Sequence, residues 1–341
     1  MADEDIGARQ GAILSAVVEE FIRSGEPVGS KNLVGRYRLT VSAATVRNDM
    51  SHLEELGYLV QPHTSAGRIP TDLGYRFFVD HLTQPVAIDE NQKQALEREL
   101  APVQAGIEEL LQKATEILSR HTRQAAAVLA PSISGAKLRH LDLVRLSQRL
   151  VLVVIVSDNG RVDKRLVELD YDVTQADLDK AQRDLNKNLL DKLLNEAQSA
   201  AATLATGKQK KLVQGVADAL GEVIQEEARM FVGGTANLAG ETAFGELDTL
   251  HRIIEALESQ KSMTRLLANA LDAPTSVKIG SEVGVEDLQS CSVVIASYNV
   301  EGTPLGSVGV IGPTRMDYTR ALAFTSAVAR AIAGRFEEIS G

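Results

Sequence analysis

The sequence predicts an α+β protein made of several domains, and three observations support this. Amphipathic stretches follow one another closely near the start of the chain, two β-rich hairpins lie far apart, and a long helix-forming stretch separates them. The length of 341 residues is enough for two or three domains. Hydrophobic residues make up 44% and charged residues 24% of the chain, which excludes a disordered or collagen-like protein.

Three short helices are expected at the start of the chain. Residues 12–22 place their apolar side chains along one helical stripe. Ser30 is expected to cap a second helix that continues through Tyr37. Ser42 is expected to cap a third helix that ends at Gly57. Such a rapid succession of short helices is typical of a small DNA-binding unit.

Two short strands are expected directly after these helices. Residues 58–60 are strand-like, residues 61–67 form a loop of small and polar residues, and residues 68–69 return before a helix boundary at 70–71. Strands around such a loop form a β-wing. Helices followed by a wing are the parts of a winged helix-turn-helix, which we predict for residues 1–82.

The third predicted helix presents a face suited to reading DNA. Four of its apolar residues have the spacing of a core-facing stripe, which leaves their polar neighbours pointing outward. These apolar residues are Ala43, Val46, Met50 and Leu53. Arg47 can pair bidentately with guanine and Asn48 with adenine, at roughly 1 to 3 kcal/mol of discrimination each. Ala44 and Thr45 allow close approach and contact with the thymine methyl group.

Other polar residues of this region are expected to position the DNA. Ser30 and Ser42 lie at helix starts, where backbone N–H groups favour phosphate, and Lys31 adds a cation. Wing residues can contact the phosphate backbone or the minor groove. The full set of candidate DNA-binding residues is Ser30, Lys31, Ser42, Ala44, Thr45, Arg47, Asn48, His63, Thr64 and Arg68. Alternatively, Ser42 only caps its helix, and Arg47 and Asn48 only form a solvated face.

Residues 83–123 are predicted to form a helical linker. Apolar residues from Leu96 to Ile117 recur at alternating spacings of four and three, as in a coiled-coil seam. Pro102 interrupts this pattern, and a proline inside a helix costs about 3 kcal/mol. We therefore expect two helices, the second beginning near Pro102. The seam can lie within one subunit or between two subunits, and both alternatives stay open.

Two hairpins predict a second folded domain. They comprise residues 150–169 and residues 292–311. Because an isolated hairpin is marginal in water, we expect both to lie in one antiparallel sheet with helices on one face. A final Ala-rich helix is expected from about Asp317 to Ile339.

The stretch between the hairpins is expected to be an insertion. The sheet domain would consist of residues 124–173 and 250–341, and residues 174–249 would form a mainly helical inserted domain. Apolar stripes from Leu185 to Leu193 and from Leu212 to Val223 need a partner surface. Either the parent domain or another subunit can supply that surface.

Signatures of catalysis, metals and cofactors are sparse. The six histidines form no His-Glu-x-x-His pair, and the one cysteine, Cys291, leads into a strand-like run typical of a buried thiol. The glycines from Gly302 to Gly312 lack the Gly-Lys-Ser/Thr ending of a phosphate loop. Residues 232–235 fit an anion site or, more often, a tight connection. We expect no catalytic residues, metal or cofactor, and an enzyme fused to a DNA-binding unit finds no nucleophile and base to support it.

The charge distribution restricts how the chain meets DNA. The formal net charge is −10, which excludes a generally basic nucleic-acid coat. Residues 28–78 hold six basic and four acidic residues, or +2, so the remainder carries 30 basic and 42 acidic residues, or −12. Because non-specific binding is mainly electrostatic, the acidic remainder should repel non-specific DNA. A single cysteine cannot close an intrachain disulfide, and the sequence shows no charged-then-apolar signal pattern, so we expect a cytoplasmic protein. No apolar run approaches the roughly 20 residues that span a bilayer, so we expect no membrane partner.

Five stretches of the sequence carry a specific resemblance to a known family. They are residues 25–30, 41–50, 53–71, 231–238 and 309–318. In these stretches the chain closely resembles the HrcA family of bacterial heat-inducible transcription repressors. The stretches are long and extend from the first helices to the last, so the resemblance covers essentially the whole chain.

The resemblance implies a fold and a function. The fold would be a winged helix, a GAF-like domain and a dimerising domain inserted into it, in a homodimer. The expected partners are double-stranded DNA, at the inverted-repeat CIRCE operator of groE- and dnaK-type chaperone operons, and the GroEL chaperonin. Repression would need the chaperonin, and would be lost when heat-unfolded proteins occupy it. The family offers no ligand that we can assign to residues of the GAF-like domain.

Two other functions stay open at this point. One is a metabolite-responsive transcriptional regulator with an effector pocket in the GAF-like domain. Apolar strands with few convergent polar groups do not favour such a pocket. The other is a chaperonin client or co-chaperone, which would show no sequence-specific retention of DNA.

Overall fold

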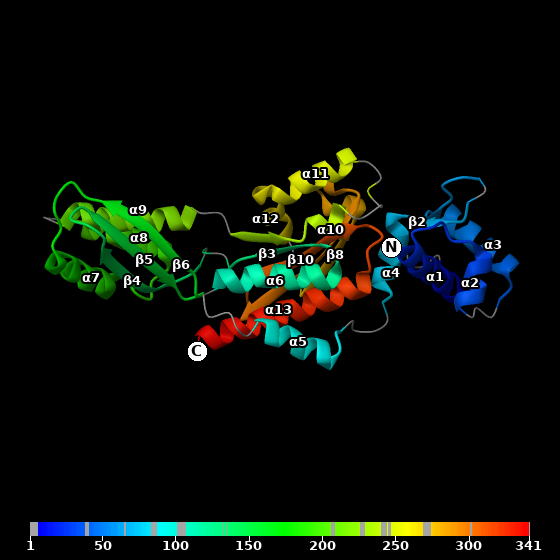
Figure 1. Ribbon diagram of the computed structural model, residues 1–341, viewed down its shortest axis with the longest axis horizontal. Helices are drawn as coiled ribbons and strands as arrows, with labels where there is room; N and C mark the ends of the chain where they lie inside the picture. Colours follow the sequence, from blue (N-terminus) through cyan, green and yellow to red (C-terminus); the bar gives the residue numbers. More distant parts are fainter. Residues whose placement is uncertain are drawn as a thin grey trace.

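The computed structural model describes residues 6–37, 41–64, 66–82, 87–100, 107–131, 133, 135–205, 209–225, 229–239, 244, 247–268, 274–300 and 302–340. The molecule is elongated, and three regions follow one another along its longest axis (Figure 1). A helical region near the N-terminus lies at one end and a five-stranded sheet with helices lies in the middle. A three-stranded sheet with helices lies at the other end.

The region near the N-terminus contains four helices and two short strands. They are α1 (Ala8–Ser24), α2 (Ser30–Tyr37), α3 (Ala43–Glu55), β1 (Leu59–Val60), β2 (Ile69–Pro70) and α4 (Asp72–Asp80). The two strands pair antiparallel. The three expected helices and the strand pair after them are therefore present, whereas most of the predicted turn at residues 38–41 lies outside the described residues.

Of the two helix caps predicted in this region, one is present in the structure and the other is displaced by one residue. Ser42 caps α3, because its Oγ accepts a hydrogen bond from the backbone N–H of Thr45 at 3.1 Å. Ser30 does not stand at the cap of α2. The helix begins at Ser30, and the carbonyl of Gly29 accepts its first backbone bond, from Leu33, at 3.3 Å. The cap residue is the one that supplies this carbonyl, so Gly29 holds the position predicted for Ser30.

The middle region is built on an antiparallel sheet with the strand order β7-β3-β10-β9-β8. Its strands are β3 (Ala125–Leu129), β7 (Met230–Gly233), β8 (Thr275–Ile279), β9 (Cys291–Val300) and β10 (Thr303–Pro313). Its helices are α5 (Glu90–Leu100), α6 (Ile107–Thr122), α10 (Ala236–Ala239), α11 (Leu247–Glu258), α12 (Gln260–Ala268) and α13 (Tyr318–Ser340). Two short 3₁₀ turns, η4 (Gly280–Val283) and η5 (Glu286–Leu288), join β8 to β9.

Helices cover both faces of this five-stranded sheet. Ala126 and Val128 of β3 point into a cluster shared with α6 and α13, whereas Ala125 and Ala127 point into a cluster shared with α11 and α12. This alternation is the ordinary period of a strand. The expected arrangement had helices on one face only, and the second layer comes from the segment between β7 and β8.

The predicted linker forms two helices, α5 and α6, as expected from the proline between them. Pro102 itself lies outside the described residues. Leu96 and Leu100 of α5 and Leu110 and Ile117 of α6 are buried in one cluster, which also contains side chains of α13. The described part of the seam is therefore internal to the subunit.

The third region joins a three-stranded antiparallel sheet, in the order β4-β5-β6, to three helices. Its elements are β4 (Leu138–Arg145), β5 (Leu150–Ser157), β6 (Val162–Glu168), α7 (Gln175–Leu189), α8 (Leu194–Leu204) and α9 (Lys210–Gln225). The apolar stripes of the helices are buried against alternate residues of the strands, among them Val151, Val153 and Ile155. A sheet of the same chain thus supplies the partner surface that these stripes need.

The prediction of one sheet holding both hairpins is wrong. The hairpin β5-β6 pairs with β4, while the hairpin β9-β10 pairs with β3 and β8 in the other sheet. Two hairpins need additional strands to be stable, but the sequence does not say which strands those are. The strand missing from the prediction is Leu138–Arg145, which gives the first hairpin a sheet of its own.

One hydrophobic cluster extends through the first two regions. It begins with Ile13 of α1 and Val46 of α3, continues through Phe78 of α4, and reaches Val294 in the five-stranded sheet and Phe336 of α13. The three-stranded region has a separate cluster of its own. The molecule in Figure 1 therefore has three regions along its length but a core shared by two of them.

Several smaller expectations can be compared with the structure. Cys291 is fully buried, and this burial raises the pKa of its thiol to about 12, as expected for a structural cysteine. Gly234 has φ +72°, and a Cβ there would meet Ser119, which favours a tight connection over an anion site. Among the described helices, none combines the length and apolar character that crossing a membrane requires. The described residues also hold no group of three or more side chains placed to bind a metal ion.

Candidate nucleic-acid interface

Helix α3 separates a buried face from an exposed face. Val46, Met50 and Leu53 are buried, as predicted, whereas Ala43 is only partly buried. Asp49 is the fourth buried residue of the helix. The carboxylate of Asp49 accepts two hydrogen bonds from Arg9 of α1, at 2.9 Å from Nε and 3.1 Å from Nη2. This ion pair fixes α3 to α1.

The exposed side of α3 forms a groove with the start of α2. Ala44, Arg47 and Asn48 are exposed on α3. The groove is lined by Gly29, Ser30, Lys31, Ala43, Ala44, Arg47 and Asn48. Five of the candidate DNA-binding residues therefore share one surface, on which a guanidinium, an ammonium, an amide and a hydroxyl are available for hydrogen bonding.

A second hollow connects this groove to the wing. It is lined by Val28, Gly29, Ser30, Arg47, Met50, Ala66, Gly67 and Arg68. Arg47 and Ser30 line both hollows, so they stand where the helical surface meets the wing. Gly67 permits this arrangement, because a Cβ at residue 67 would collide with the backbone carbonyl of Val28.

Ser42 and Thr45 pair with each other at the start of α3. Their hydroxyl oxygens are 2.9 Å apart, and Ser42 also caps the helix. Thr45 is partly buried and Ser42 is exposed. Both hydroxyls have a structural partner in the free protein, and the first-turn N–H groups beside them form the positive end of the helix dipole.

The wing is held in shape by side-chain contacts. Gln61 donates from Nε2 to the carbonyl oxygens of Thr64 at 3.1 Å and Ala66 at 2.8 Å. His63 and Thr64 are exposed at the tip of the loop. This bracing presents the two side chains on a loop of defined shape.

Arg68 braces the wing against α3. Its Nε donates to Glu54 Oε2 at 2.9 Å, and its side chain is only 17% exposed. Its backbone N–H and C=O pair with those of Val28, each at 2.9 Å. The guanidinium is therefore shared with Glu54, which sets Arg68 apart from the exposed Arg47.

The ion pairs described above also shape the charge of the interface. Asp49 and Glu54 lie on α3, where unpaired carboxylates would oppose phosphate. Arg9 and Arg68 offset these two charges at distances of 2.9 Å. Lys31 and Arg47 remain on the groove side. Sequence reasoning missed Arg9 and Glu54, although a charged residue at a core-facing position, such as Asp49, indicates that a partner is required.

Comparison with known proteins identifies the family. The family model described as the HrcA protein C terminal domain matches residues 108–322. The chain belongs to the HrcA family. The resemblance in the sequence motifs is thereby confirmed, and the family is one of transcription repressors and not of enzymes.

Relatives in the HrcA family extend over almost the whole chain. The heat-inducible transcription repressor HrcA of Nocardia farcinica is 41% identical over 333 residues, which cover 95% of each chain. The protein of the same name from Acidothermus cellulolyticus is 41% identical over 331 residues, covering 94% of this chain and 96% of the relative.

A solved structure supports the architecture. It is described as the crystal structure of a hypothetical protein at 2.2 Å resolution, and it matches with a TM-score of 0.70 at 23% identity. The match covers 98% of this chain and 99% of the other. The likeness concerns the fold, which the two chains share along nearly their full length.

Proposed function

We propose that this HrcA-family chain represses transcription by binding, as a homodimer, the inverted-repeat CIRCE operator of chaperone operons. The region from α1 to β2 would act as a winged helix-turn-helix, with α3 in the major groove. The observation that carries the proposal is the groove between α2 and α3, where Ser30, Lys31, Arg47 and Asn48 converge. A repressor of chromosomal operons in bacteria acts in the cytoplasm.

The chemistry of the groove agrees with this role. Arg47 and Asn48 have the donors and acceptors that recognise guanine and adenine in the major groove. Lys31 and Ser30 lie across the groove from them and suit phosphate contacts that fix the register. His63 and Thr64 at the wing tip are proposed to contact the backbone beside the recognised bases. Arg68 would act mainly by holding the wing on α3 through Glu54.

The three-stranded sheet offers a surface for the proposed homodimer. One face of this sheet packs on α7, α8 and α9, and the other face carries exposed apolar side chains. They include Leu166 at 62%, Leu146 at 51%, Val162 at 46% and Val144 at 39% exposure. Alternate residues of β5 lie between them and are only partly buried. A contiguous apolar face of this kind favours association.

The charges on this face suit a second copy of the chain. Asp142 of β4 and Lys164 of β6 both pair with Val154 of the central strand, so the three side chains form one row across the sheet. A two-fold axis parallel to β5 places β4 of one subunit over β6 of the other. Asp142 would then face the partner's Lys164, and the same contact would occur twice. We propose that the insertion dimerises through this face and spans residues 133–225.

Replacing Leu166 with glutamate is expected to convert the dimer to monomers. Val144, Leu152 and Leu166 form one row across the sheet, so the proposed axis places residue 166 over the partner's Val144, and a glutamate there would be desolvated against an apolar side chain in each half of the interface. The oligomeric state can be measured by analytical ultracentrifugation, and operator binding by titration. We expect the monomer to bind the full operator at least about tenfold more weakly, because avidity is lost. Leu247→Glu is the control, because Leu247 is 83% exposed on α11, and a dimeric L166E protein would contradict the proposed surface.

Heat inactivation and rescue by a chaperonin complete the proposed function. We expect a heated sample to lose binding to an inverted-repeat promoter fragment and to regain it when GroEL and ATP are added. An excess of unfolded protein should abolish the rescue, because both compete for the chaperonin. A gel-shift titration with a scrambled fragment as control measures all three states. Tight, specific binding that persists after heating without chaperonin would refute this part of the proposal.

The alternative of a metabolite-responsive regulator has weaker support. A ligand in the GAF-like domain, which we propose is the five-stranded sheet, would need access to one face of that sheet. Helices cover both faces, and the side chains between helices and sheet are mainly apolar, while buried hydroxyls such as those of Ser292 and Ser307 already have hydrogen-bond partners in the protein. A screen for ligands that raise the melting temperature would separate the two functions.

A further inference from the structure

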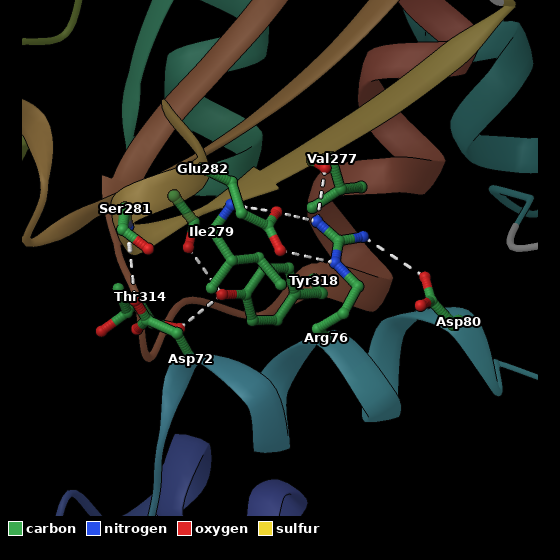
Figure 2. Close-up of polar contacts among 10 residues, drawn as sticks. Asp72, Arg76, Asp80, Val277, Ile279, Ser281, Glu282, Thr314 and Tyr318 are labelled. Carbon is green, nitrogen blue, oxygen red and sulfur yellow. Dashed lines mark hydrogen bonds and ion pairs between the residues drawn. The ribbon is translucent and has the colours of Figure 1, made fainter. Parts of the chain in front are cut away.

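Helix α4 connects the proposed DNA-binding region, which extends from α1 to β2, to the five-stranded sheet through a set of polar contacts (Figure 2). Arg76 of α4 lies at its centre. Arg76 donates from Nη2 to the carbonyl of Val277 at 2.7 Å and from Nε to Glu282 Oε1 at 3.0 Å. It also forms a second contact with Glu282 Oε2 and one with Asp80 at 3.3 Å. The fork of one guanidinium therefore joins α4 to both β8 and η4.

Glu282 is held in place for this contact. Its Oε2 accepts a hydrogen bond from the backbone N–H of Ile279 at 3.0 Å. Burial, the largest single influence, raises the pKa of Glu282, but the hydrogen bonds from Arg76 and Ile279 and the positive charges of Arg76 and Lys278 together outweigh it, so the pKa lies below its ordinary value. The side chain is charged at neutral pH, and its orientation toward Arg76 is fixed by the backbone of its own turn.

A second contact lies at the first turn of α4. Asp72 Oδ2 accepts a hydrogen bond from the backbone N–H of Ser281 at 3.3 Å. Gly280 has φ +55°, and a Cβ at that position would collide with the Asp72 carboxylate. The chain can approach α4 this closely because residue 280 is glycine.

Aromatic packing lies beneath the polar contacts. The rings of Tyr75 on α4 and Tyr318 at the start of α13 have centroids 5.8 Å apart. The Tyr318 hydroxyl donates to the Thr314 carbonyl at 2.6 Å and is 2.7 Å from the Ser292 hydroxyl. Both tyrosines are almost fully buried. The contact between α4 and the five-stranded sheet thus combines packed tyrosine rings in its interior with charged contacts nearer the surface.

The contacts of α4 lie where they can control the position of α3 relative to the rest of the molecule. Figure 1 shows the DNA-binding region at one end of the molecule and the three-stranded sheet at the other, with the five-stranded sheet between them. If the dimer forms through the three-stranded sheet, the position of each α3 relative to the dimer interface depends on α4 and on the five-stranded sheet, which lie between them. A rotation at α4 would move α3 relative to its symmetry mate, whereas inverted-repeat operators require half-sites at a fixed separation.

We propose that the α4 clamp, formed by Asp72, Arg76, Gly280, Ser281 and Glu282, sets the half-site separation that the dimer accepts. Arg76 and Glu282 are positioning residues, which act on the DNA through the direction of α3 and make no contact with the operator themselves. This inference rests on the proposed function, since it assumes a dimer that binds an inverted repeat.

The test uses the full-length dimer and a series of operators. Wild type, Arg76→Ala and Glu282→Gln are titrated with the natural inverted repeat, with repeats whose spacer is changed by one or two base pairs, and with a single half-site. Arg149→Ala is the matched control, because its ion pair with Asp172 at 2.8 Å is exposed and lies in the three-stranded region. Ultracentrifugation confirms that each variant is a dimer.

We expect both clamp variants to bind the natural operator about tenfold more weakly, which corresponds to about 1.4 kcal/mol. Their affinity for the single half-site should equal that of wild type, and their preference for the natural spacer should shrink to about twofold. R149A should behave as wild type. A clamp variant that keeps the wild-type spacing preference would overturn the inference.

Two further outcomes keep the inference separate from the proposed function. If wild type does not distinguish the inverted repeat from a scrambled fragment, the proposed function fails and the clamp is not the cause. If R76A loses half-site binding as well, its DNA-binding region is misfolded, and R76A cannot test the clamp. The E282Q variant then tests it, because glutamine retains the size of the glutamate side chain. An E282Q protein with normal half-site affinity and unchanged spacing preference would then refute the role of the clamp.

Discussion

Replacing Arg47 with alanine is expected to weaken operator binding by roughly 1 to 3 kcal/mol at each half-site, and by about twice that for the dimer. Arg47 is exposed on α3 and lines both the groove with α2 and the hollow beside the wing. A bidentate contact with guanine lost in both subunits accounts for this size. Folding should not change, because the side chain lies outside the buried stripe of α3.

The measurement is an equilibrium titration of specific and scrambled fragments at one fixed salt concentration. Arg47→Lys separates recognition from charge: lysine retains the cation but not the planar fork, so we expect specific affinity to fall while non-specific affinity is retained. Arg98→Ala on α5 is the control, because Arg98 is exposed far from the groove. Unchanged operator affinity in R47A would remove Arg47 from the reading surface.

Asp163→Ala is expected to destabilise the protein by roughly 3 to 5 kcal/mol, the usual cost of removing one partner of a buried ion pair. The Asp163 side chain is fully buried and contacts Arg161 at 2.9 Å and Arg229 at 3.1 Å. Arg161 is itself only 7% exposed. The substitution therefore removes a buried carboxylate from its contact with a buried guanidinium.

Urea unfolding followed by circular dichroism measures this loss as a shift of the midpoint. The contact joins β6 to Arg229, which directly precedes β7 and also pairs with Glu108 of α6. We therefore expect the loss to weaken the junction between the two sheets. Asp172→Ala is the control, since Asp172 is 58% exposed and its pair with Arg149 should contribute at most about 1 kcal/mol. Equal midpoints for the two variants would contradict the argument.

Much of the local structure could be predicted from the sequence, because local patterns determine it. The Ser42 cap, the turn at residues 158–160 and the interruption at Pro102 each depend on neighbours within a few residues. The assignment of hairpins to sheets could not be predicted. Strand pairing brings together residues far apart in the chain, and β9 and β5 are similarly apolar, so nothing in either strand specifies its partner.

In the candidate site, too, the sequence predicted the features that depend on local spacing and missed those that depend on contacts between distant residues. The spacing on α3 correctly separated exposed Arg47 and Asn48 from buried Val46 and Met50. The ion pairs with Arg9 and Glu54 were not predicted, because each joins residues whose proximity exists only in the folded chain. For the same reason, the sequence grouped Arg68 with the DNA-binding residues, whereas the structure shows it paired with Glu54. The contacts of these residues with DNA stay a prediction.

The shared core of the first two regions has a consequence for how the protein melts. Apolar side chains from α1 to α13 form one cluster, so the proposed DNA-binding region shares its interior with the five-stranded sheet. Residues that share one hydrophobic core tend to unfold together, even where the shape of the molecule shows two separate regions. Heat that unfolds the five-stranded sheet is therefore expected to unfold α3, the proposed recognition helix, as well, while the three-stranded region, which has its own cluster, would stay folded and hold the proposed dimer together. On heating, such a protein would release DNA before its two subunits separated. Refolding would then start from a dimer.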